Sequence, residues 1–318
     1  MTDLGYALSS EEHGPRELVR LAQRAEAVGF SFAMISDHFH PWIDQQGQSP
    51  FVWSVIGAVA QATHQLRLGT GVTCPIIRIH PAIVAQAAAT AEAMMPGRFF
   101  LGVGSGENLN EHILGDRWPP TDVRQEMLEE AVGLIRRLWE GELTTHRGRY
   151  FTVENARLYT LPEQPPPLLM AASGPESARL AARVADGLIS VTPSEQVVGE
   201  FRASAGGERP RYGQVTVCWA ETEEEGRRIA HSWWPNAGLK GPLSSELPVP
   251  AHFQQASAMV TEADVAQVIV CGPDPKRHIE QIARYAEAGY DHVYVHQVGP
   301  QQEGFFDFYQ REVLPEFR

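Results

Sequence analysis

The feature that most constrains the fold is the alternation of short apolar runs with amphipathic stretches along almost the whole chain. The runs are rich in branched residues and alternate little with polar ones, which is typical of parallel strands covered on both faces. Helix patterns separate them. Eight such units in 318 residues predict an α/β fold, a (β/α)8 TIM barrel forming a single domain over residues 1–318. The strand candidates are residues 4–8, 32–36, 66–72, 98–104, 168–173, 187–191, 215–220 and 291–297.

Two stretches do not fit the plain repeat and are expected to be insertion segments. Residues 141–167 have the pattern of a hairpin followed by a proline-rich loop, and a second insertion, about 235–265, precedes the last helix and strand. Insertions that follow the strands of a barrel usually build the rim of its active site. Both segments are therefore candidates for that rim.

Composition excludes several classes of partner. The formal net charge of −13 argues against nucleic acid, because phosphate contacts need a basic surface. The sequence has no apolar run long enough for a transmembrane helix and no signal-peptide pattern, so we expect no membrane partner and a cytoplasmic protein. Three widely spaced cysteines argue against a disulfide framework. The two lysines, Lys240 and Lys276, follow no convincing strand, which disfavours a Schiff-base aldolase and leaves other small-molecule chemistry.

Ionisable side chains gather at the predicted exits of strands one, two and four. In a (β/α)8 barrel these exits meet at one mouth, where catalytic residues lie. The stretch "SDHFHPW", residues 36–42, is the densest of them. This convergence predicts an enzyme whose candidate residues are Glu11, Asp37, His38, His40, Glu107 and Asn110.

The pair "HFH" in that stretch raises the question of metal binding. An H-x-H pair at a strand end occurs in metal-dependent hydrolase barrels, but here strands four to six offer no histidine or lysine, and only His296 could assist. For Asp37, bonding within its own turn is the ordinary alternative. For His38, beside Trp42 and facing Glu107, an acid–base role is favoured because imidazole exchanges protons near neutral pH. We therefore expect no metal site.

Two glycine-containing turns bear on cofactor binding. "GVGSGE" lies on the fourth strand with the spacing G-x-G-x-G, which is not a dinucleotide fingerprint but permits close backbone approach to a flat ligand. "SGPES" runs into a helix whose free N–H groups would suit a phosphate. A simple helix cap by Ser173 would explain the same residues. The residues alone leave both interpretations open.

Taken together, these stretches resemble the coenzyme F420-dependent branch of the luciferase-like monooxygenase and dehydrogenase superfamily. The resemblance covers essentially the whole chain and is greatest to the group that includes F420-dependent glucose-6-phosphate dehydrogenase. Several independent pieces in the right order make it specific. They are "GYALSSEE", "ISDHFHPW", "LRLGTGVTCPIIRIHPAIVAQAAAT", "RFFLGVGSGENLNE", "LLMAASGPESARLAARVADGLI" and "AGYDHVYVHQ".

The resemblance implies a luciferase-like barrel, commonly a homodimer, with the deazaflavin ring in the mouth. It matches His38 to the active-site histidine and Glu107 to the carboxylate assigned to proton transfer. Trp42 matches the tryptophan beside the substrate, Glu11 a further acidic residue of the pocket, and Asp37 the aspartate that contacts the ring. It also implies a cis peptide bond at the end of strand three and favours the phosphate interpretation of "SGPES". The other implied cofactor contacts are Gly71 and Val72 (the two sides of the cis bond), Cys74, Ser105, Gly106, Asn110, Ser173, Gly174, Glu176 and Ser177.

The sequence departs from the family pattern where a sugar phosphate would be held. The sugar-phosphate enzymes use lysines there, and the matching positions are Ser194 and Gln255, so a dianionic phosphate would be poorly held. Cys74 stands in place of a hydroxyl residue, and His40 in place of a glutamine. We therefore expect an F420-dependent oxidoreductase that moves a hydride between the deazaflavin C5 and an alcohol or carbonyl carbon of a small, non-phosphorylated substrate.

Three other functions stay open on the sequence. The same barrel could use FMN and oxygen as a luciferase-like monooxygenase, although the "SDHFHPW" and Glu107 matches argue against it. A metal-dependent hydrolase and a cofactor-binding barrel without catalysis are the others. Neither the direction of the reaction nor the choice of His38 or Glu107 as the substrate base follows from the sequence.

Overall fold

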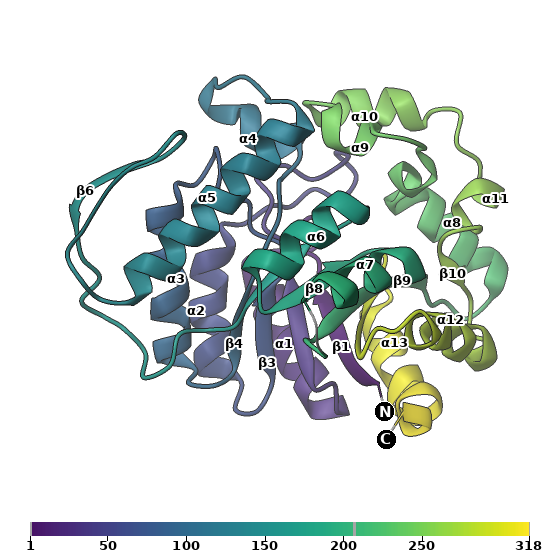
Figure 1. Ribbon diagram of the computed structural model, residues 1–318. Helices are drawn as coiled ribbons and strands as arrows, with labels where there is room; N and C mark the ends of the chain where they lie inside the picture. The colour runs from purple at the N-terminus through teal and green to yellow at the C-terminus, as the bar shows by residue number, and fades with distance from the viewer. Residues whose placement is uncertain (1, 206–207, 318) are drawn as a thin grey trace.

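The computed structural model describes residues 2–205 and 208–317, and its central element is a closed ring of parallel strands (Figure 1). Each strand pairs with its neighbours in the order predicted for a barrel, and pairing of Leu188 with Arg211 closes the ring. The predicted (β/α)8 fold is therefore confirmed. The ring consists of β1 (Asp3–Leu8), β2 (Phe32–Ile35), β3 (Arg67–Thr70), β4 (Phe99–Val103), β7 (Leu168–Ala171), β8 (Gly187–Ser190), β9 (Arg211–Cys218) and β11 (His292–Gln297). A further short strand, β10 (Val270–Cys271), pairs with β9 outside the ring.

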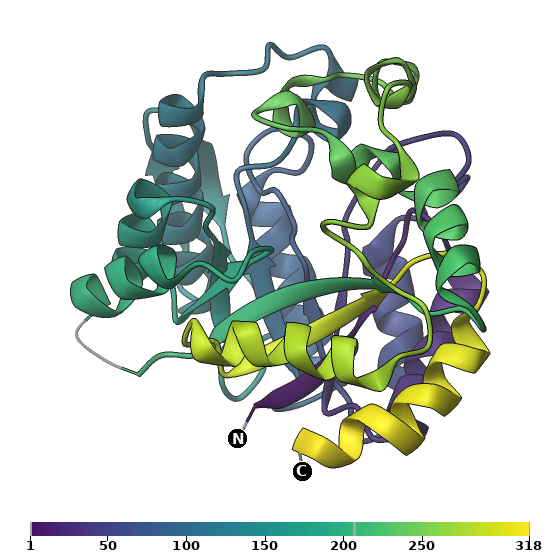
Figure 2. The same cartoon turned by 90° about the vertical axis from the view of Figure 1, so that its right-hand side faces the viewer.

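Helices follow the strands and surround the ring, as Figures 1 and 2 show from two sides. The first begins at Pro15 as predicted, and Gly29 ends it with a left-handed φ of 104°. The helices are α1 (Pro15–Val28), α2 (Val52–Ala62), α3 (Pro81–Met94), α4 (Asn108–Glu111), α5 (Thr121–Trp139), α6 (Pro175–Val184), α7 (Glu195–Ala205), α8 (Glu223–Trp233), α12 (Pro275–Glu287) and α13 (Gln302–Phe308).

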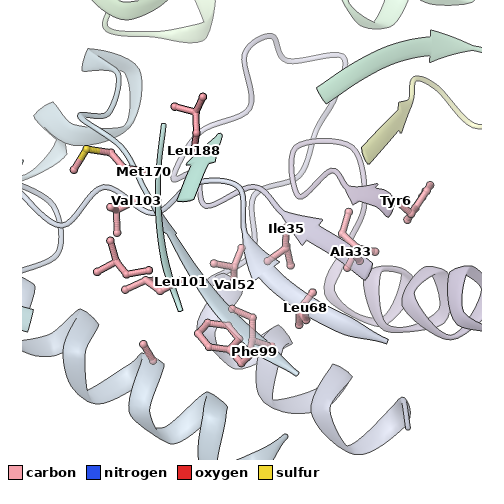
Figure 3. Packing of buried hydrophobic residues seen from close by; sticks show 14 of the residues in the cluster. Tyr6, Ala33, Ile35, Val52, Leu68, Phe99, Leu101, Val103, Met170 and Leu188 are labelled. Atoms are coloured by element: carbon pink, nitrogen blue, oxygen red, sulfur yellow. The ribbon is translucent and has the colours of Figure 1, made fainter. Parts of the chain in front are cut away.

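Apolar side chains fill both faces of the strands, which explains why the strand sequences show so little polar alternation. The outer faces pack against the helices, where Leu68, Phe99 and Leu101 belong to one large cluster (Figure 3). A smaller cluster fills the inside of the barrel: Ala7, Phe32, Met34, Phe100, Leu169, Ile189, Tyr212 and Tyr294. The barrel is thus a packed core, and chemistry is confined to its open end.

The two insertions lie in different places. The first contains the expected hairpin, β5 (Thr144–Arg147) and β6 (Thr152–Ala156), but Glu130 in the middle of α5 accepts hydrogen bonds from the backbone of Tyr150 and Phe151. The hairpin therefore packs on the outside of α5, and the idea that it forms part of the rim is wrong.

The second insertion lies over the mouth of the barrel. It contains α9 (Leu243–Glu246), α10 (Pro250–Ser257) and α11 (Glu262–Val265). Asn108, at the start of α4, donates a hydrogen bond to the Glu246 carbonyl. In Figure 1, α9 and α10 lie on the same side of the molecule as α4. Among the described residues, no helix has the length and apolarity needed to cross a bilayer.

Two glycines should respond in opposite ways to substitution by alanine, because one lies in the packed barrel and the other on an open part of α5. A Cβ at Gly69 of β3 would lie 2.0 Å from Cε2 of Phe100, so Gly69→Ala should lower the free energy of unfolding by about 1–3 kcal/mol. Gly133 lies within α5, where an added Cβ would meet no atom within 4 Å, so Gly133→Ala should raise it by about 0.5–1 kcal/mol. Urea unfolding midpoints of the wild type and the two variants measure both effects. Midpoints equal to that of the wild type would contradict the packing described.

Candidate active site

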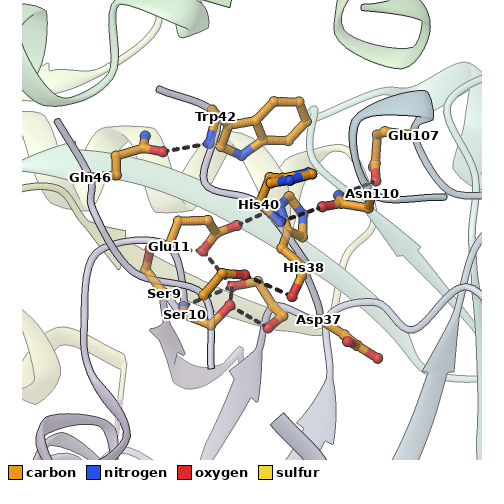
Figure 4. Close-up of polar contacts among 12 residues, drawn as sticks. Ser9, Ser10, Glu11, Asp37, His38, His40, Trp42, Gln46, Glu107 and Asn110 are labelled. Carbon is orange, nitrogen blue, oxygen red and sulfur yellow. Dashed lines mark hydrogen bonds and ion pairs between the residues drawn. The ribbon is translucent and has the colours of Figure 1, made fainter. Parts of the chain in front are cut away.

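The structure brings the residues predicted for strand exits one, two and four together at the mouth (Figure 4). Glu11 follows β1, His38 and Trp42 follow β2, and Glu107 precedes α4. Figure 4 shows the side chains of Glu11 and His38 directed toward each other, with Trp42 beside the imidazole. The convergence predicted from the strand order is therefore observed.

Glu11 is a buried carboxylate that faces His38. One oxygen, Oε2, accepts hydrogen bonds from the hydroxyls of Ser9 at 3.0 Å and Ser36 at 2.6 Å. The other, Oε1, lies 3.3 Å from His38 Nδ1, which is buried and makes no geometrically good hydrogen bond to the described residues. This arrangement favours a proton on Nδ1 and leaves Nε2 as the basic nitrogen. The imidazole is 10% exposed, so the ring remains accessible from the mouth.

Aromatic rings wall the pocket beside this pair. The Trp42 ring lies edge-on to His38 at 5.1 Å between centroids, and edge-on to Phe253 of α10 at 5.2 Å. The Trp42 backbone N–H donates to Gln46 Oε1, and the Gln46 amide donates in turn to the Trp233 carbonyl. Phe253 of the second insertion thus completes an apolar wall with Trp42 beside the histidine.

Asn110 connects the loop after β2 to α4. Its Oδ1 accepts from the backbone N–H groups of Phe39 at 2.9 Å and His40 at 3.1 Å, while Nδ2 donates to Glu107 Oε2 at 3.4 Å. Because Asn110 is buried, these bonds hold Glu107 at a set position relative to the histidine loop.

His40 and His296, which were considered as metal ligands together with His38, each contact other groups. His40 Nδ1 bonds to the Leu109 carbonyl at 2.9 Å, and its ring stacks on His112 at 6.1 Å. His296, the possible further metal ligand, instead bonds to buried Glu12 at 3.0 Å. Within residues 2–205 and 208–317, no group of three or more histidine, cysteine, aspartate or glutamate side chains is placed to hold a metal ion.

Asp37 belongs to a buried charge network that sequence analysis did not find. Its carboxylate is 1% exposed and accepts from Thr73 Oγ1 at 2.7 Å and from Arg78 Nη2 at 2.8 Å. The Arg78 backbone N–H donates to Glu111 Oε2 at 2.8 Å, and its Nε lies 3.6 Å from Glu111 Oε1. Asp37 is thus neither free in the mouth nor bonded only within its own turn.

Burial raises the pKa of Glu111 to about 7. The backbone N–H and charge of Arg78 oppose the rise, and the charges of Glu107 and Asp37 add to it. A signal for this network was present in the sequence, because Arg78 is a lone cation in the apolar run "CPIIRI". Only the fold shows that it meets Asp37 and Glu111.

The backbone at the exits of β3 and β4 leaves little room for side chains. The Gly71–Val72 peptide bond is cis, as the resemblance implied. A Cβ at Gly104 would lie 2.6 Å from Val72 Cγ2, and one at Gly106, whose φ is 73°, would lie 2.5 Å from Cys74 Sγ. Gly106 adjoins Ser105, which is partly buried. Burial raises the pKa of the Cys74 thiol, so this cysteine is unreactive and acts as packing.

The start of α6 differs from a simple cap by Ser173. The N-cap residue is Gly174, and the hydroxyl of Ser177 accepts from the backbone N–H groups of Ser173 and Gly174, each at 3.2 Å. Ser173 and Glu176 are exposed. The turn is therefore open to a ligand at the N-terminus of the helix.

Arg124, near the start of the neighbouring helix α5, is a second feature that sequence analysis missed. Its guanidinium lies 4.0 Å from the Trp118 ring centroid, donates to Thr121 Oγ1 and sits 3.7 Å from Glu246 Oε1. The side chain is 3% exposed, yet Nε and Nη1 have no hydrogen-bond partner among the described residues. A buried cation with two free donors suits an anionic group.

The chain is similar over almost its whole length to known proteins. The luciferase-like monooxygenase family model matches residues 1–292. An F420-dependent glucose-6-phosphate dehydrogenase of Microbacterium testaceum is 35% identical, with 99% of this chain and 97% of that protein covered. The structure of an F420-dependent secondary alcohol dehydrogenase in complex with an F420–acetone adduct is 34% identical, with a TM-score of 0.92 and coverage of 100% of this chain and 99% of the other.

A more distant structure shows the fold alone. The coenzyme F420-dependent tetrahydromethanopterin reductase from Methanopyrus kandleri has a TM-score of 0.80 at 21% identity, with 100% of this chain and 99% of that chain covered. Together, the family model and the full-length relatives place this chain in the luciferase-like monooxygenase family.

Proposed function

We propose that this protein is an F420-dependent dehydrogenase that transfers a hydride between the deazaflavin C5 and the alcohol or carbonyl carbon of a small, non-phosphorylated substrate. The observation that carries the proposal is the buried Glu11–His38 pair at the mouth, with Glu107 held nearby by Asn110. The chain is also 34–35% identical, over almost its full length, to proteins named as F420-dependent dehydrogenases.

The residues at the mouth fit such a cofactor. At Gly71 and Gly106 a Cβ would crowd Met34 and Cys74 inside the protein, so glycine lets the partly exposed backbone lie close to its support, and such a backbone edge suits a flat ring. The start of α6 offers the backbone N–H groups of Glu176 and Ser177 to a phosphate, whereas those of Ser173 and Gly174 donate to Ser177 Oγ and fix the shape of the turn. Arg124, which has two donors without a partner among the described residues, adds a positive charge close to Glu107, whose charge acts on its guanidinium. When bound, F420 supplies the ring carbon that accepts or donates the hydride.

The protein's own residues then handle the proton. In the oxidation direction, His38 Nε2 takes the proton of the substrate hydroxyl, and Glu11 stabilises the imidazolium through Nδ1. Glu107, held by Asn110, is the carboxylate that exchanges a proton on the side of the pocket where the ring lies. Trp42 and Phe253 exclude water from the reacting atoms. This assignment selects His38 as the substrate base, because His38 has the carboxylate partner.

The lining of the pocket supports a substrate without a phosphate group. Gln255 is an exposed residue of α10, and Ser194 uses its hydroxyl to accept from the Val197 N–H. Neither carries the positive charge that a dianionic phosphate needs. The side chain that α10 presents to Trp42 is instead Phe253. An apolar wall beside the base is better suited to a simple alcohol or ketone.

Turnover assays test the substrate class. With F420 as acceptor, secondary alcohols should bleach the deazaflavin absorbance, and glucose 6-phosphate at the same concentration should not. If glucose 6-phosphate gives a higher kcat/KM than every alcohol tried, the proposal of a non-phosphorylated substrate fails.

A variant tests the role of His38 as the substrate base. His38→Asn should lower kcat by about 10²–10⁴-fold with unchanged affinity for F420. An equal loss of F420 affinity would instead show that His38 only shapes the cofactor site.

We also propose that the protein forms a homodimer through α2 and α3. A groove of about 290 Å³ between these helices is lined without any charged residue, and Phe51 and Ile83 beside it are 57% and 55% exposed. Apolar projections and an apolar groove on one face can pair with a second copy about a two-fold axis.

Sedimentation velocity tests the dimer. The protein should sediment as a dimer, and Ile83→Glu should convert it to a monomer because a charge would be buried in the interface. Met259→Glu, at a residue that is 87% exposed outside this groove, is the matched control and should remain dimeric. A dimer that persists in Ile83→Glu would exclude this face.

A further inference from the structure

Glu111 is a buried carboxyl group below the proposed cofactor site, and the proposed mechanism does not use it. Its side chain is 1% exposed. A Cβ at Gly106 would lie 3.0 Å from Glu111 Cγ and 2.5 Å from Cys74 Sγ, so Glu111 packs directly under the backbone that would face the ring. It also follows Asn110, the residue that holds Glu107. Any ligand that covers Gly106 therefore changes the surroundings of Glu111.

The contacts of Arg78 are divided unequally between two carboxylates. Asp37 accepts from Arg78 Nη2 through both its carboxylate, at 2.8 Å, and its backbone carbonyl, at 3.1 Å, and it also accepts from Thr73. Glu111 receives the Arg78 backbone N–H and only a longer contact of 3.6 Å to Nε. One cation cannot fully compensate two buried carboxylates. The less well bonded of the two, Glu111, is therefore the one that takes a proton.

Several charged or titratable groups act on Glu111. Arg78 and Cys74 come from the segment between β3 and α3, Asp37 from the exit of β2, and Glu107 from the start of α4. Of these groups, Arg78 alone carries a positive charge. With the pKa of Glu111 raised to about 7 by burial, its carboxyl group is partly protonated near neutral pH before any ligand binds.

We propose that Glu111 takes up a proton from solvent when F420 binds and thereby couples cofactor affinity to pH. The inference rests on the proposed cofactor. F420 is anionic and excludes water from the backbone above Glu111, and both effects favour the neutral carboxyl group. The complex then holds more protons than its separate components. F420 affinity therefore falls as pH rises through the window between the free and bound pKa values of Glu111. The fall is at most about tenfold per pH unit for one coupled group.

Calorimetry in two buffers measures the proton directly. F420 is titrated into the protein at pH 7 in phosphate and in Tris, whose heats of ionisation differ, so that the difference in binding heat gives the protons taken up. We expect the wild type to take up a fraction of one proton. Glu111→Gln keeps the amide oxygen as an acceptor for the Arg78 N–H, and it should bind F420 with that uptake abolished. Repeating the wild-type titration at about pH 5 should give little uptake, because Glu111 is then already protonated.

Glu92→Gln is the matched control. Glu92 is another buried glutamate with its pKa raised by burial, but it accepts from Gly97 and Phe99 at the start of β4, the end of the barrel away from the mouth. This variant should take up the same protons as the wild type.

The outcomes separate the two proposals. If F420 binds to the wild type without proton uptake, or if Glu111→Gln takes up as many protons as the wild type, the role of Glu111 is overturned while the cofactor assignment stands. If F420 does not bind at all, the proposed function fails and the inference fails with it. Should Glu111→Gln not fold, the wild-type titrations at the two pH values still decide, since uptake that is equal at both would overturn the inference.

Discussion

The mouth of the barrel depends on one buried arginine. Arg78 bonds to Asp37 after β2 and to Glu111 at the end of α4, and its own segment follows β3. Three strand exits are thereby held together below the surface that would carry a cofactor. Buried charges are costly unless they are paired and hydrogen-bonded, so each member of this network restricts where the others can lie. The loops that carry His38 and Glu107 are positioned above it.

A second set of polar contacts fixes the orientation of the Glu11 and Glu107 carboxylates. Ser9 and Ser36 hold Glu11 so that one oxygen faces His38, and Asn110 holds Glu107 while binding the backbone of the histidine loop. These contacts are made by short side chains of buried or partly buried residues at strand exits, so little rotamer freedom remains in them. These contacts hold the Glu11 carboxylate and the His38 imidazole in the arrangement that the proposed proton transfer needs.

Local sequence patterns predicted the fold and the composition of the mouth, because strand exits can be located from apolar runs and all exits of a parallel barrel meet at one end. The cis bond at Gly71–Val72 followed from resemblance and is present. Arg78, Glu111 and Arg124 were missed because their importance comes from partners distant in sequence: Arg78 meets Asp37 41 residues away, and Arg124 faces Glu246 of the second insertion. The hairpin at 141–167 was recognised but misplaced, since the backbone contacts that dock it on Glu130 have no local signature.

Every role proposed for the residues at the mouth requires that the mouth bind coenzyme F420. Titration of the purified apo-protein with F420 and, separately, with FMN, followed by absorbance and fluorescence quenching, tests it most directly. We expect saturable binding of F420 and no binding of FMN at the same concentrations. Binding of FMN with F420 ignored would contradict it and would turn the Glu11–His38 pair toward oxygen chemistry.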